Sequence, residues 1–371
     1  SLFFNYTNRS RDRYESFLYC LRRTPSMQHI LDPDTNTLNA WVDQQGLPIF
    51  RAAQIRRWIF ASRAESFADM TNLPLALRTE LETHFQWWTT RTATHQKAED
   101  GTEKLLLELA DGQRIECVLL REGERRTICI STQVGCAMGC VFCASGLDGV
   151  VRNLTAGEIV EQMLRLGRLL PEDERLSHIA VMGMGEPLAN LSNLLPALAI
   201  ASQQEGLGIS PRRMTISTVG LPVAMHRLAE SAVPYNLAVS LHAANDALRD
   251  KLVPVNDKSG LSAILTAADE YFEASGRRLT FEYVLLGGIN DRREDALELA
   301  GLLRGRPALL NLIPYNPVAG LPYQTPTAEA VDTFSGLLSQ RGINIQIRRR
   351  KGSRIDAACG QLRRTKAGAA E

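Results

Sequence analysis

The sequence predicts an α/β protein in which a parallel sheet closes into a full or partial barrel, preceded by a small helical domain. Beyond residue 150, strand-like apolar runs alternate with helical stretches over about 200 residues, a pattern typical of βαβ units. Between residues 38 and 88, apolar residues instead recur at helix-like spacings. A chain of 371 residues is long enough for one large domain and one small one.

The N-terminal part divides into three predicted segments. Residues 1–37 are polar, contain the breakers Pro25 and Pro33, and are expected to form a poorly structured extension. Residues 38–95 form the predicted helical accessory domain. A β-extension over residues 96–125 follows, with strands at 105–109 and 114–120 that are joined by the turn signal Asp111-Gly112.

The predicted barrel covers residues 126–352, and residues 353–371 form a C-terminal tail. Its first strand is expected at 127–131. Thr155-Ala156-Gly157-Glu158 has the spacing of a capping box and opens a helix that continues through Leu170. The later strands are expected at 179–184, 214–217, 237–241, 279–286, 309–313 and 343–347, with helices between them that include 261–275 and 328–340.

Composition narrows the class of protein. Hydrophobic residues make up 44% of the chain and charged residues 22%, as in an ordinary soluble protein, and no apolar run is long enough for a membrane span. The first residues lack the pattern of a secretory signal, so a cytoplasmic location is expected. The net charge is +1, but nine basic residues stand against one acid between Arg341 and Lys366. This stretch is either a phosphate-binding surface or a solvated basic tail.

Three of the seven cysteines lie within eight residues, which points to a metal site rather than a disulfide framework. Cys136, Cys140 and Cys143 have the spacing C-x3-C-x2-C, directly after the strand at 127–131. Zinc sites usually pair two C-x2-C units, and ordinary four-iron sites use four thiolates. Three thiolates can hold three irons of a [4Fe–4S] cube and leave the fourth iron open to a small molecule.

This loop, with Phe142 before its last cysteine, resembles that of the radical S-adenosylmethionine (SAM) superfamily. The resemblance implies a partial (βα)6 radical SAM barrel, one [4Fe–4S] cluster and SAM as cofactors. It also implies SAM contacts from the turn Gly183-Met184-Gly185-Glu186-Pro187 and from later strand ends, where barrels bind their ligands. The matching SAM-binding residues are Gly185, Glu186, Ser217, Ser240, Leu241, His242 and Asn316.

Further motifs resemble the RlmN/Cfr family of RNA adenine methyltransferases, from about residue 38 to residue 362, and within it the RlmN branch. They are Phe50-Arg51-Ala52-Ala53-Gln54-Ile55, Ile115-Glu116-Cys117-Val118, Cys129-Ile130-Ser131-Thr132-Gln133-Val134-Gly135-Cys136, Arg152-Asn153-Leu154-Thr155, Ile313-Pro314-Tyr315-Asn316-Pro317 and Ile355-Asp356-Ala357-Ala358-Cys359-Gly360-Gln361-Leu362. The late cysteine, Cys359, is the family's hallmark.

The resemblance implies roles for three residues outside the cluster. Cys359 would be methylated by one SAM molecule, and a radical derived from a second SAM would take a hydrogen from that S-methyl group. The resulting methylene radical adds to adenine and joins RNA to protein. Glu116 would then remove the ring proton, and Cys129 would attack the Cys359 sulfur and release the product as a disulfide forms.

The implied substrate is carbon 2 of an adenosine in the peptidyl-transferase region of 23S rRNA, together with the adenosine beside the tRNA anticodon. Basic residues between Arg51 and Arg63 and the run from Arg348 to Lys351 would contact phosphates, so the helical domain is expected to bind RNA. An electron donor such as flavodoxin or ferredoxin and a monomeric state are also implied. Ala144-Ser145-Gly146, where the family usually has Ala-Thr-Gly, and Arg354, where an acid is common, depart from the pattern.

Other functions remain open on the sequence alone. A Cfr-like enzyme would methylate carbon 8 of the same rRNA adenosine. A noncatalytic RNA-binding protein with a structural cluster is disfavoured, because binding has no use for Cys359, Glu116 and Cys129. A radical SAM enzyme acting on a small molecule or peptide is disfavoured by the basic tail and the helical domain. Cys20 and Cys117 are interpreted as structural or incidental.

Overall fold

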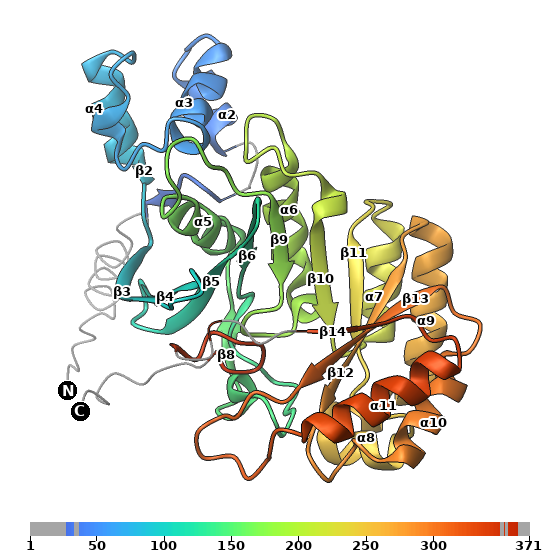
Figure 1. Ribbon diagram of the computed structural model, residues 1–371. Helices are drawn as coiled ribbons and strands as arrows, with labels where there is room; N and C mark the ends of the chain where they lie inside the picture. Colours follow the sequence, from blue (N-terminus) through green and yellow to red (C-terminus); the bar gives the residue numbers. More distant parts are fainter. Residues whose placement is uncertain (1–26, 33–36, 349–351, 353–354, 363–371) are drawn as a thin grey trace, which may run out of the picture.

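A single curved sheet organises the molecule, with helices around it and a small helical module at one end (Figure 1). The computed structural model describes residues 27–32, 37–348, 352 and 355–362, and in these residues the main sheet has ten strands. The strand order is β14-β13-β12-β11-β10-β9-β6-β5-β4-β3. In the described part of the chain the end strands do not pair with each other, so the barrel is partial, as predicted.

The parallel part of the sheet is the predicted barrel. Each neighbouring pair from β6 through β14 is parallel. Its strands are short apolar runs whose central residues are buried, as expected for a sheet that is covered on both faces. The strands are β6 (Arg125–Cys129), β9 (His178–Val181), β10 (Met214–Thr218), β11 (Asn236–Ser240), β12 (Leu279–Leu285), β13 (Ala308–Pro314) and β14 (Ile345–Ile347).

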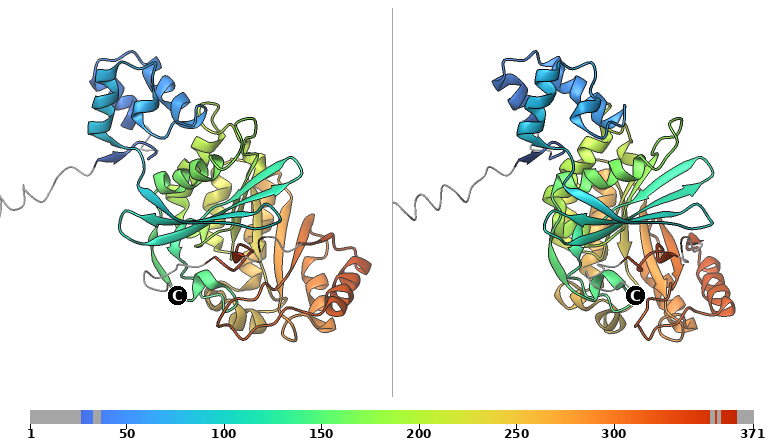
Figure 2. Two further views of the ribbon diagram at one scale, coloured as in Figure 1. Left: turned by 60° about the vertical axis from the view of Figure 1, so that its left-hand side comes forward. Right: turned by 90° about the vertical axis from the view of Figure 1, so that its left-hand side faces the viewer.

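Helices connect successive parallel strands and pack around the outside of the sheet (Figure 2). The first begins with the predicted capping box: the Thr155 hydroxyl accepts from the Glu158 amide at 3.1 Å, and the Glu158 carboxylate accepts from the Thr155 amide at 2.9 Å. The helices are α5 (Ala156–Gly167), α6 (Leu191–Ser202), α7 (Pro222–Glu230), α8 (Asp246–Leu252), α9 (Gly260–Ser275), α10 (Arg293–Leu303) and α11 (Ala328–Gln340).

An antiparallel ribbon extends the sheet beyond β6. It consists of β5 (Arg114–Glu122), β4 (Glu103–Leu109) and β3 (Thr90–Lys97). The sequence analysis had no strand at β3, because its residues are polar and mostly exposed on the edge of the sheet. The sheet therefore begins inside the segment expected to be helical.

The N-terminal module contains the predicted helices α2 (Thr37–Gln44), α3 (Phe50–Phe60) and α4 (Leu75–His84). They share a core that includes Trp41, Ile55 and Leu81. Within the extension expected to be poorly structured, β1 (Gln28–His29) pairs with β2 (Phe85–Gln86), and the next two residues are buried. Two residues of strand carry too little pattern to be recognised in a sequence. Residues 1–26, 33–36, 349–351, 353–354 and 363–371, with parts of the predicted extension and basic tail, lie outside the described residues.

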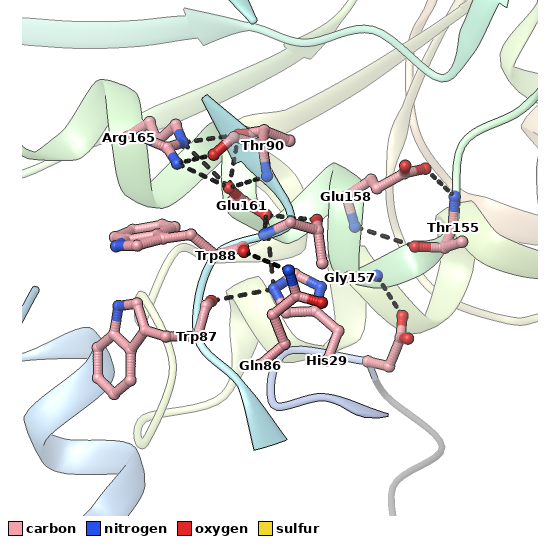
Figure 3. A network of polar contacts seen from close by, with 12 residues as sticks. His29, Gln86, Trp87, Trp88, Thr90, Thr155, Gly157, Glu158, Glu161 and Arg165 are labelled. Carbon is pink, nitrogen blue, oxygen red and sulfur yellow. Dashed lines mark hydrogen bonds and ion pairs between the residues drawn. The ribbon is translucent and has the colours of Figure 1, made fainter. Parts of the chain in front are cut away.

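A buried polar network joins this module to the barrel (Figure 3). Its centre is Glu161 of α5, which is fully buried and accepts hydrogen bonds from the amides and hydroxyls of Thr89 and Thr90 at 2.5–3.0 Å. Arg165 pairs with the same carboxylate at 3.0 Å, and the His29 ring lies 3.5 Å from it. Thr89 and Thr90 lead from the module into β3, so this carboxylate fixes the link between the two parts.

In the described residues, no helix is long and apolar enough to cross a membrane.

Candidate functional site

The three clustered cysteines lie on one loop, Cys136–Cys143, which we call the cluster loop. It begins after β7 (Gln133–Gly135), which pairs with β8 (Val150–Asn153). The Cys136 amide donates to the Gly149 carbonyl at 2.9 Å, and the Val141 amide donates to the Leu252 carbonyl at 3.1 Å. These bonds hold the loop between the hairpin and the end of α8. All three cysteines line one cavity at the carboxyl ends of the parallel strands, which we call the central cavity.

The chemistry of these thiols fits an iron–sulfur cluster. Burial raises the pKa of Cys136 to about 12, and burial also raises the pKa values of Cys140 and Cys143. Such thiols become thiolates only when a strong positive charge compensates for burial, and bound iron supplies that charge. Among the described residues, no three His, Cys, Asp or Glu side chains converge as ligands of a single ion. Thiolates that each bind a different iron of a cube lie farther apart than thiolates that share a single metal ion.

The turn after β9 borders the cluster loop. Gly185 has φ of +100°, and a Cβ there would lie 2.6 Å from the Cβ of Gln133. A Cβ on Gly183 would lie 2.6 Å from the Ile130 carbonyl oxygen. Glycine is therefore required at both positions, because the turn packs directly against the chain that leaves β6.

Glu186 follows this turn and is buried in the lining of the central cavity. Its carboxylate accepts from the Val219 amide at 2.9 Å and from the Leu188 amide at 3.0 Å. Burial raises the pKa of Glu186, although these hydrogen bonds oppose the effect. A buried carboxylate held in this way has the chemistry to pair with a ligand ammonium group.

The ends of the next strands complete the lining. Ser217, Ser240 and His242 reach the central cavity, whereas Leu241 is buried outside its lining. His242 has φ of +61°, and its Nδ1 accepts from the Val284 amide at 3.1 Å. Burial and, to a smaller extent, the charge of Arg249 lower the pKa of His242 to about 3, so the ring is neutral near pH 7. A neutral ring suits a binding surface better than acid–base catalysis.

Arg249 of α8 supports this part of the cavity from behind and is a residue that the sequence analysis missed. Its side chain is fully buried and donates to the Leu241 carbonyl at 3.0 Å and to the Ser240 carbonyl at 2.9 Å. It therefore fixes the end of β11, where the predicted SAM contacts Ser240, Leu241 and His242 stand. Nothing in the sequence separates it from a surface arginine.

The C-terminal segment, residues 355–362, returns to the mouth of the central cavity. Asn316, at the end of β13, donates to the Cys359 carbonyl at 3.1 Å, and the Ala144 amide donates to the Gly360 carbonyl at 2.8 Å. The Ser145 hydroxyl donates to the Leu362 carbonyl at 2.8 Å. Cys359 is exposed and lines the same cavity as the three clustered cysteines. The fold thus brings together cysteines more than two hundred positions apart.

Glu116 lies beside this segment but not in the cavity lining. It is buried on β5 and pairs with the Lys104 ammonium of β4 at 2.7 Å. The same ammonium donates to the Asp356 carbonyl at 3.3 Å. Lys104 therefore connects Glu116 to the loop that carries Cys359. Little in the sequence indicated this contact, because strand Glu103–Leu109 contains two glutamates as well as Lys104.

Cys129 ends β6 and is half-buried. Burial and the nearby Cys359 together raise the pKa of Cys129 to about 12, although the charge of Arg348 opposes the increase. Arg348 follows β14 and pairs with Glu282 at 3.3 Å, and its guanidinium also approaches the Met182 sulfur at 3.7 Å. Glu282 and Met182 both line the central cavity. Arg348 thus supplies positive charge where the two cysteines approach each other.

Most predicted site residues converge on the central cavity, and Glu116, Cys129 and Leu241 stand behind or beside it. Glu282 was missed, although a charged residue within the apolar run Leu279–Leu285 was a usable signal. Its carboxylate accepts from the Ser217 hydroxyl at 3.0 Å and also pairs with Arg348. It therefore connects a predicted SAM contact to the thiol region.

Comparisons with known proteins agree with this geometry. The model of the ribosomal RNA large subunit methyltransferase N-terminal domain matches residues 28–86, and that of the radical SAM superfamily matches residues 130–300. A probable dual-specificity RNA methyltransferase RlmN of Rhodopirellula baltica is 62% identical over 92% of each chain. One of the same name from Bacillus licheniformis is 46% identical over 88% of this chain and 91% of its own. A crystal structure of a radical SAM methyltransferase from Sphaerobacter thermophilus is 42% identical, covers 91% of this chain and 99% of its own, and superposes with a TM-score of 0.88.

Proposed function

The chain belongs to the RlmN family of radical SAM proteins, and from this premise we propose that it is an RNA methyltransferase acting on carbon 2 of adenine. The substrates we propose are the adenosine in the peptidyl-transferase region of 23S rRNA and the adenosine beside the tRNA anticodon. One observation carries the proposal: the exposed thiol of Cys359 lies in the same cavity as the three clustered cysteines. Binding alone has no use for that arrangement.

The central cavity suits the two cofactors that the family implies. Cys136, Cys140 and Cys143 would hold the [4Fe–4S] cluster, and Glu186 would pair with the SAM amino group. The other proposed SAM contacts in the cavity lining are Gly185, Ser217, Ser240, His242 and Asn316, and Leu241 stands beside them, outside the lining. Bound together, the cluster and SAM supply one-electron chemistry that removes a hydrogen atom from an unactivated group.

Cys359 is the proposed methyl carrier. Its loop is fixed through backbone carbonyls, by Asn316 and by the amide of Ala144, so the thiol itself is left to react. Adenine carbon 2 is an electron-poor ring carbon and is not nucleophilic. If the methyl group is held on the Cys359 sulfur and converted there to a reactive carbon, that carbon attacks adenine, and adenine does not have to act as the nucleophile.

Glu116 and Cys129 are proposed to finish the reaction. Glu116, held by Lys104 beside the Cys359 loop, would accept the proton from the adenine ring. Once the adduct has given its unpaired electron back to the oxidised cluster, the Cys129 thiolate would attack the Cys359 sulfur and form a disulfide. The bond from that sulfur to the methylene carbon would break, and that carbon would keep the electron pair and take up a proton to become the new methyl group. Arg348 favours this step because its charge stabilises the Cys129 thiolate.

The RNA substrate would reach the cavity through positively charged surfaces. The names of the relatives favour RNA, and the arginines of α3 together with the basic run from Arg348 onward are the proposed phosphate contacts. The target base would leave its stack to enter the cavity. We further propose an electron donor of the flavodoxin or ferredoxin type, a cytoplasmic location and a monomeric state.

Nucleoside analysis tests the proposal directly. The cluster is reconstituted without oxygen, SAM, dithionite and either an unmodified 23S rRNA fragment or a tRNA transcript are added, and digested nucleosides are analysed by mass spectrometry. We expect 2-methyladenosine with both RNAs. Cys359→Ala is expected to abolish the product, and Cys117→Ala, which removes a buried thiol outside the cavity, is expected to retain it.

The other outcomes separate the alternatives. Formation of 8-methyladenosine would assign the chain to Cfr-like chemistry. Formation of 5′-deoxyadenosine without any methylated adenosine would retain the radical chemistry and overturn the RNA substrate. Absence of both products, with an intact cluster, would favour a noncatalytic RNA-binding protein.

A further inference from the structure

A second cavity lies at the opposite edge of the sheet from the central cavity. It has a volume of about 450 Å³ and is formed by the connections that lead from α9, α10 and α11 into β12, β13 and β14. These connections meet at the amino ends of the strands, whereas the predicted SAM contacts stand at the carboxyl ends (Figure 1). Nothing in the reaction proposed above uses this cavity.

The lining of this cavity is strongly cationic. It contains Arg278, Arg304, Arg306 and Arg341 and no aspartate or glutamate. We call it the arginine cavity. A lining that contains several arginines and no carboxylate attracts an anion, and planar guanidinium groups suit phosphate oxygens in particular.

Two of the arginines have structural roles and two have none. Arg306 pairs with Asp269 through two nitrogens at 3.0–3.1 Å, and Arg341 donates to the Leu337 carbonyl at the end of α11 at 3.4 Å. Arginines at helix carboxyl ends stabilise the helix dipole, which accounts for these two. The side chains of Arg278 and Arg304 are exposed, and neither guanidinium group has a hydrogen bond or ion pair with a described residue. Their charges are therefore available to a ligand.

The position of the cavity relates it to the proposed substrate path. β14 is the edge strand of the sheet; Asn344, just before it, lines the arginine cavity, and Arg348 follows it beside the central cavity. Four residues of extended strand span about 13 Å. No other described strand pairs with the outer side of β14, so a nucleic-acid backbone that followed this edge would pass from one cavity to the other and meet positive charge at both ends.

We propose that the arginine cavity binds phosphate groups of the RNA substrate, remote from the reacting atoms, through Arg278 and Arg304. This inference rests on the proposed function, since it assigns a second contact to the same RNA. Its role is to hold and orient a large RNA, so it contributes to binding rather than to the chemical step.

The test compares two double variants with the same change in charge. Arg278→Gln with Arg304→Gln removes the proposed contacts, and Arg212→Gln with Arg227→Gln removes two exposed arginines outside the cavity. RNA binding to the holoenzyme is measured by fluorescence anisotropy at several salt concentrations. Each phosphate contact contributes about 0.7–0.9 to the slope of log affinity against log salt, so we expect the slope to fall by about 1.5 in the first variant.

Steady-state kinetics supply a second measurement. We expect KM for the rRNA fragment to rise about tenfold with kcat unchanged, because the lost contacts are phosphate contacts that do not reach the reacting base. The control variant is expected to match the wild type. Arg278→Lys with Arg304→Lys keeps both charges and is expected to restore most of the slope. Circular dichroism melts confirm that all variants are folded.

Three results would overturn parts of this reasoning separately. Equal slopes and KM values in the glutamine variant and its control would refute the inference and leave the methyltransferase proposal intact. Pyrophosphate that binds the wild type but not the variant in calorimetry, with RNA binding unchanged, would assign the cavity to a small anion and refute the RNA contact. Absence of any methylated adenosine in the wild type would instead refute the proposed function, while the binding measurements still decide the inference.

Discussion

Replacement of Glu161 by alanine tests whether one buried carboxylate joins the helical module to the barrel. The side chain is fully buried, and four donor groups from Thr89 and Thr90 end on its two oxygens, with Arg165 paired to it (Figure 3). Burial by itself would raise the pKa of Glu161, but the hydrogen bonds from Thr90, the charge of His29 and the bonds from Thr89 outweigh it and lower the pKa. The folded structure therefore stabilises the ionised form of the Glu161 carboxylate.

The size of the effect follows from what alanine leaves behind. Loss of one member of a buried ion pair costs about 3–5 kcal/mol, because the partner keeps its desolvation penalty. Arg165 retains the Thr90 hydroxyl and carbonyl as partners, and Thr89 is half-buried and can be rehydrated, which limits the loss. We expect the free energy of unfolding to fall by about 3–4 kcal/mol, a large share of the roughly 5–15 kcal/mol that stabilises most folded proteins.

Urea unfolding followed by circular dichroism measures this loss. Glu273→Ala, an exposed glutamate on α9, is the matched control and should change the free energy of unfolding by no more than about 0.5 kcal/mol. For Glu161→Gln, the loss of unfolding free energy should lie between the losses of these two variants. The glutamine amide nitrogen cannot accept the hydrogen bonds that the carboxylate oxygen accepts. A loss below about 1 kcal/mol for Glu161→Ala would show that the network does not hold the two parts together.

Three other perturbations test separate features. Gly185→Ala places a Cβ 2.6 Å from Gln133 at a φ of +100°, so SAM affinity measured by equilibrium dialysis should fall at least about tenfold. Burial raises the pKa of Cys129 to about 12, so Cys129 is a thiol at pH 8. Iodoacetamide should therefore alkylate the exposed Cys359 at least about ten times faster than Cys129, as followed by peptide mass spectrometry, and the rate at Cys129 should rise as the pH increases. Tyr271→Phe removes a buried hydroxyl that donates to a backbone carbonyl at 2.8 Å and should cost about 1 kcal/mol in urea unfolding.

The sequence was sufficient for the barrel and for the cluster loop, because both depend on local patterns. Apolar runs predict buried parallel strands wherever they occur, and the spacing of Cys136, Cys140 and Cys143 is itself the chemical signal. The capping box at Thr155 was equally local, since both of its hydrogen bonds form within four residues.

Buried charges were missed because their surroundings are assembled by distant segments. Glu161 and Arg165 lie one turn apart on α5, a pattern that in a sequence predicts an exposed pair. They are covered instead by residues 89 and 90 and by His29, which come from the helical module. Arg249 is a similar case: besides Asn256, its partners are backbone carbonyls at the ends of strands, which no local sequence pattern predicts.

The placement of Cys359 shows why a local motif is insufficient for the chemistry that we propose. Its segment is held by Asn316 just after β13, by Ser145 next to the cluster loop and by Lys104 from β4, three parts of the chain that are far apart in sequence. Lys104 also holds Glu116, so movement of the antiparallel ribbon changes the position of the proposed base and of the proposed methyl carrier together. The ribbon is therefore part of the site, although it lies outside the parallel barrel. The radical chemistry that we propose would require that coupling, because a reactive carbon on Cys359 would have to meet the adenine ring before it met any other group.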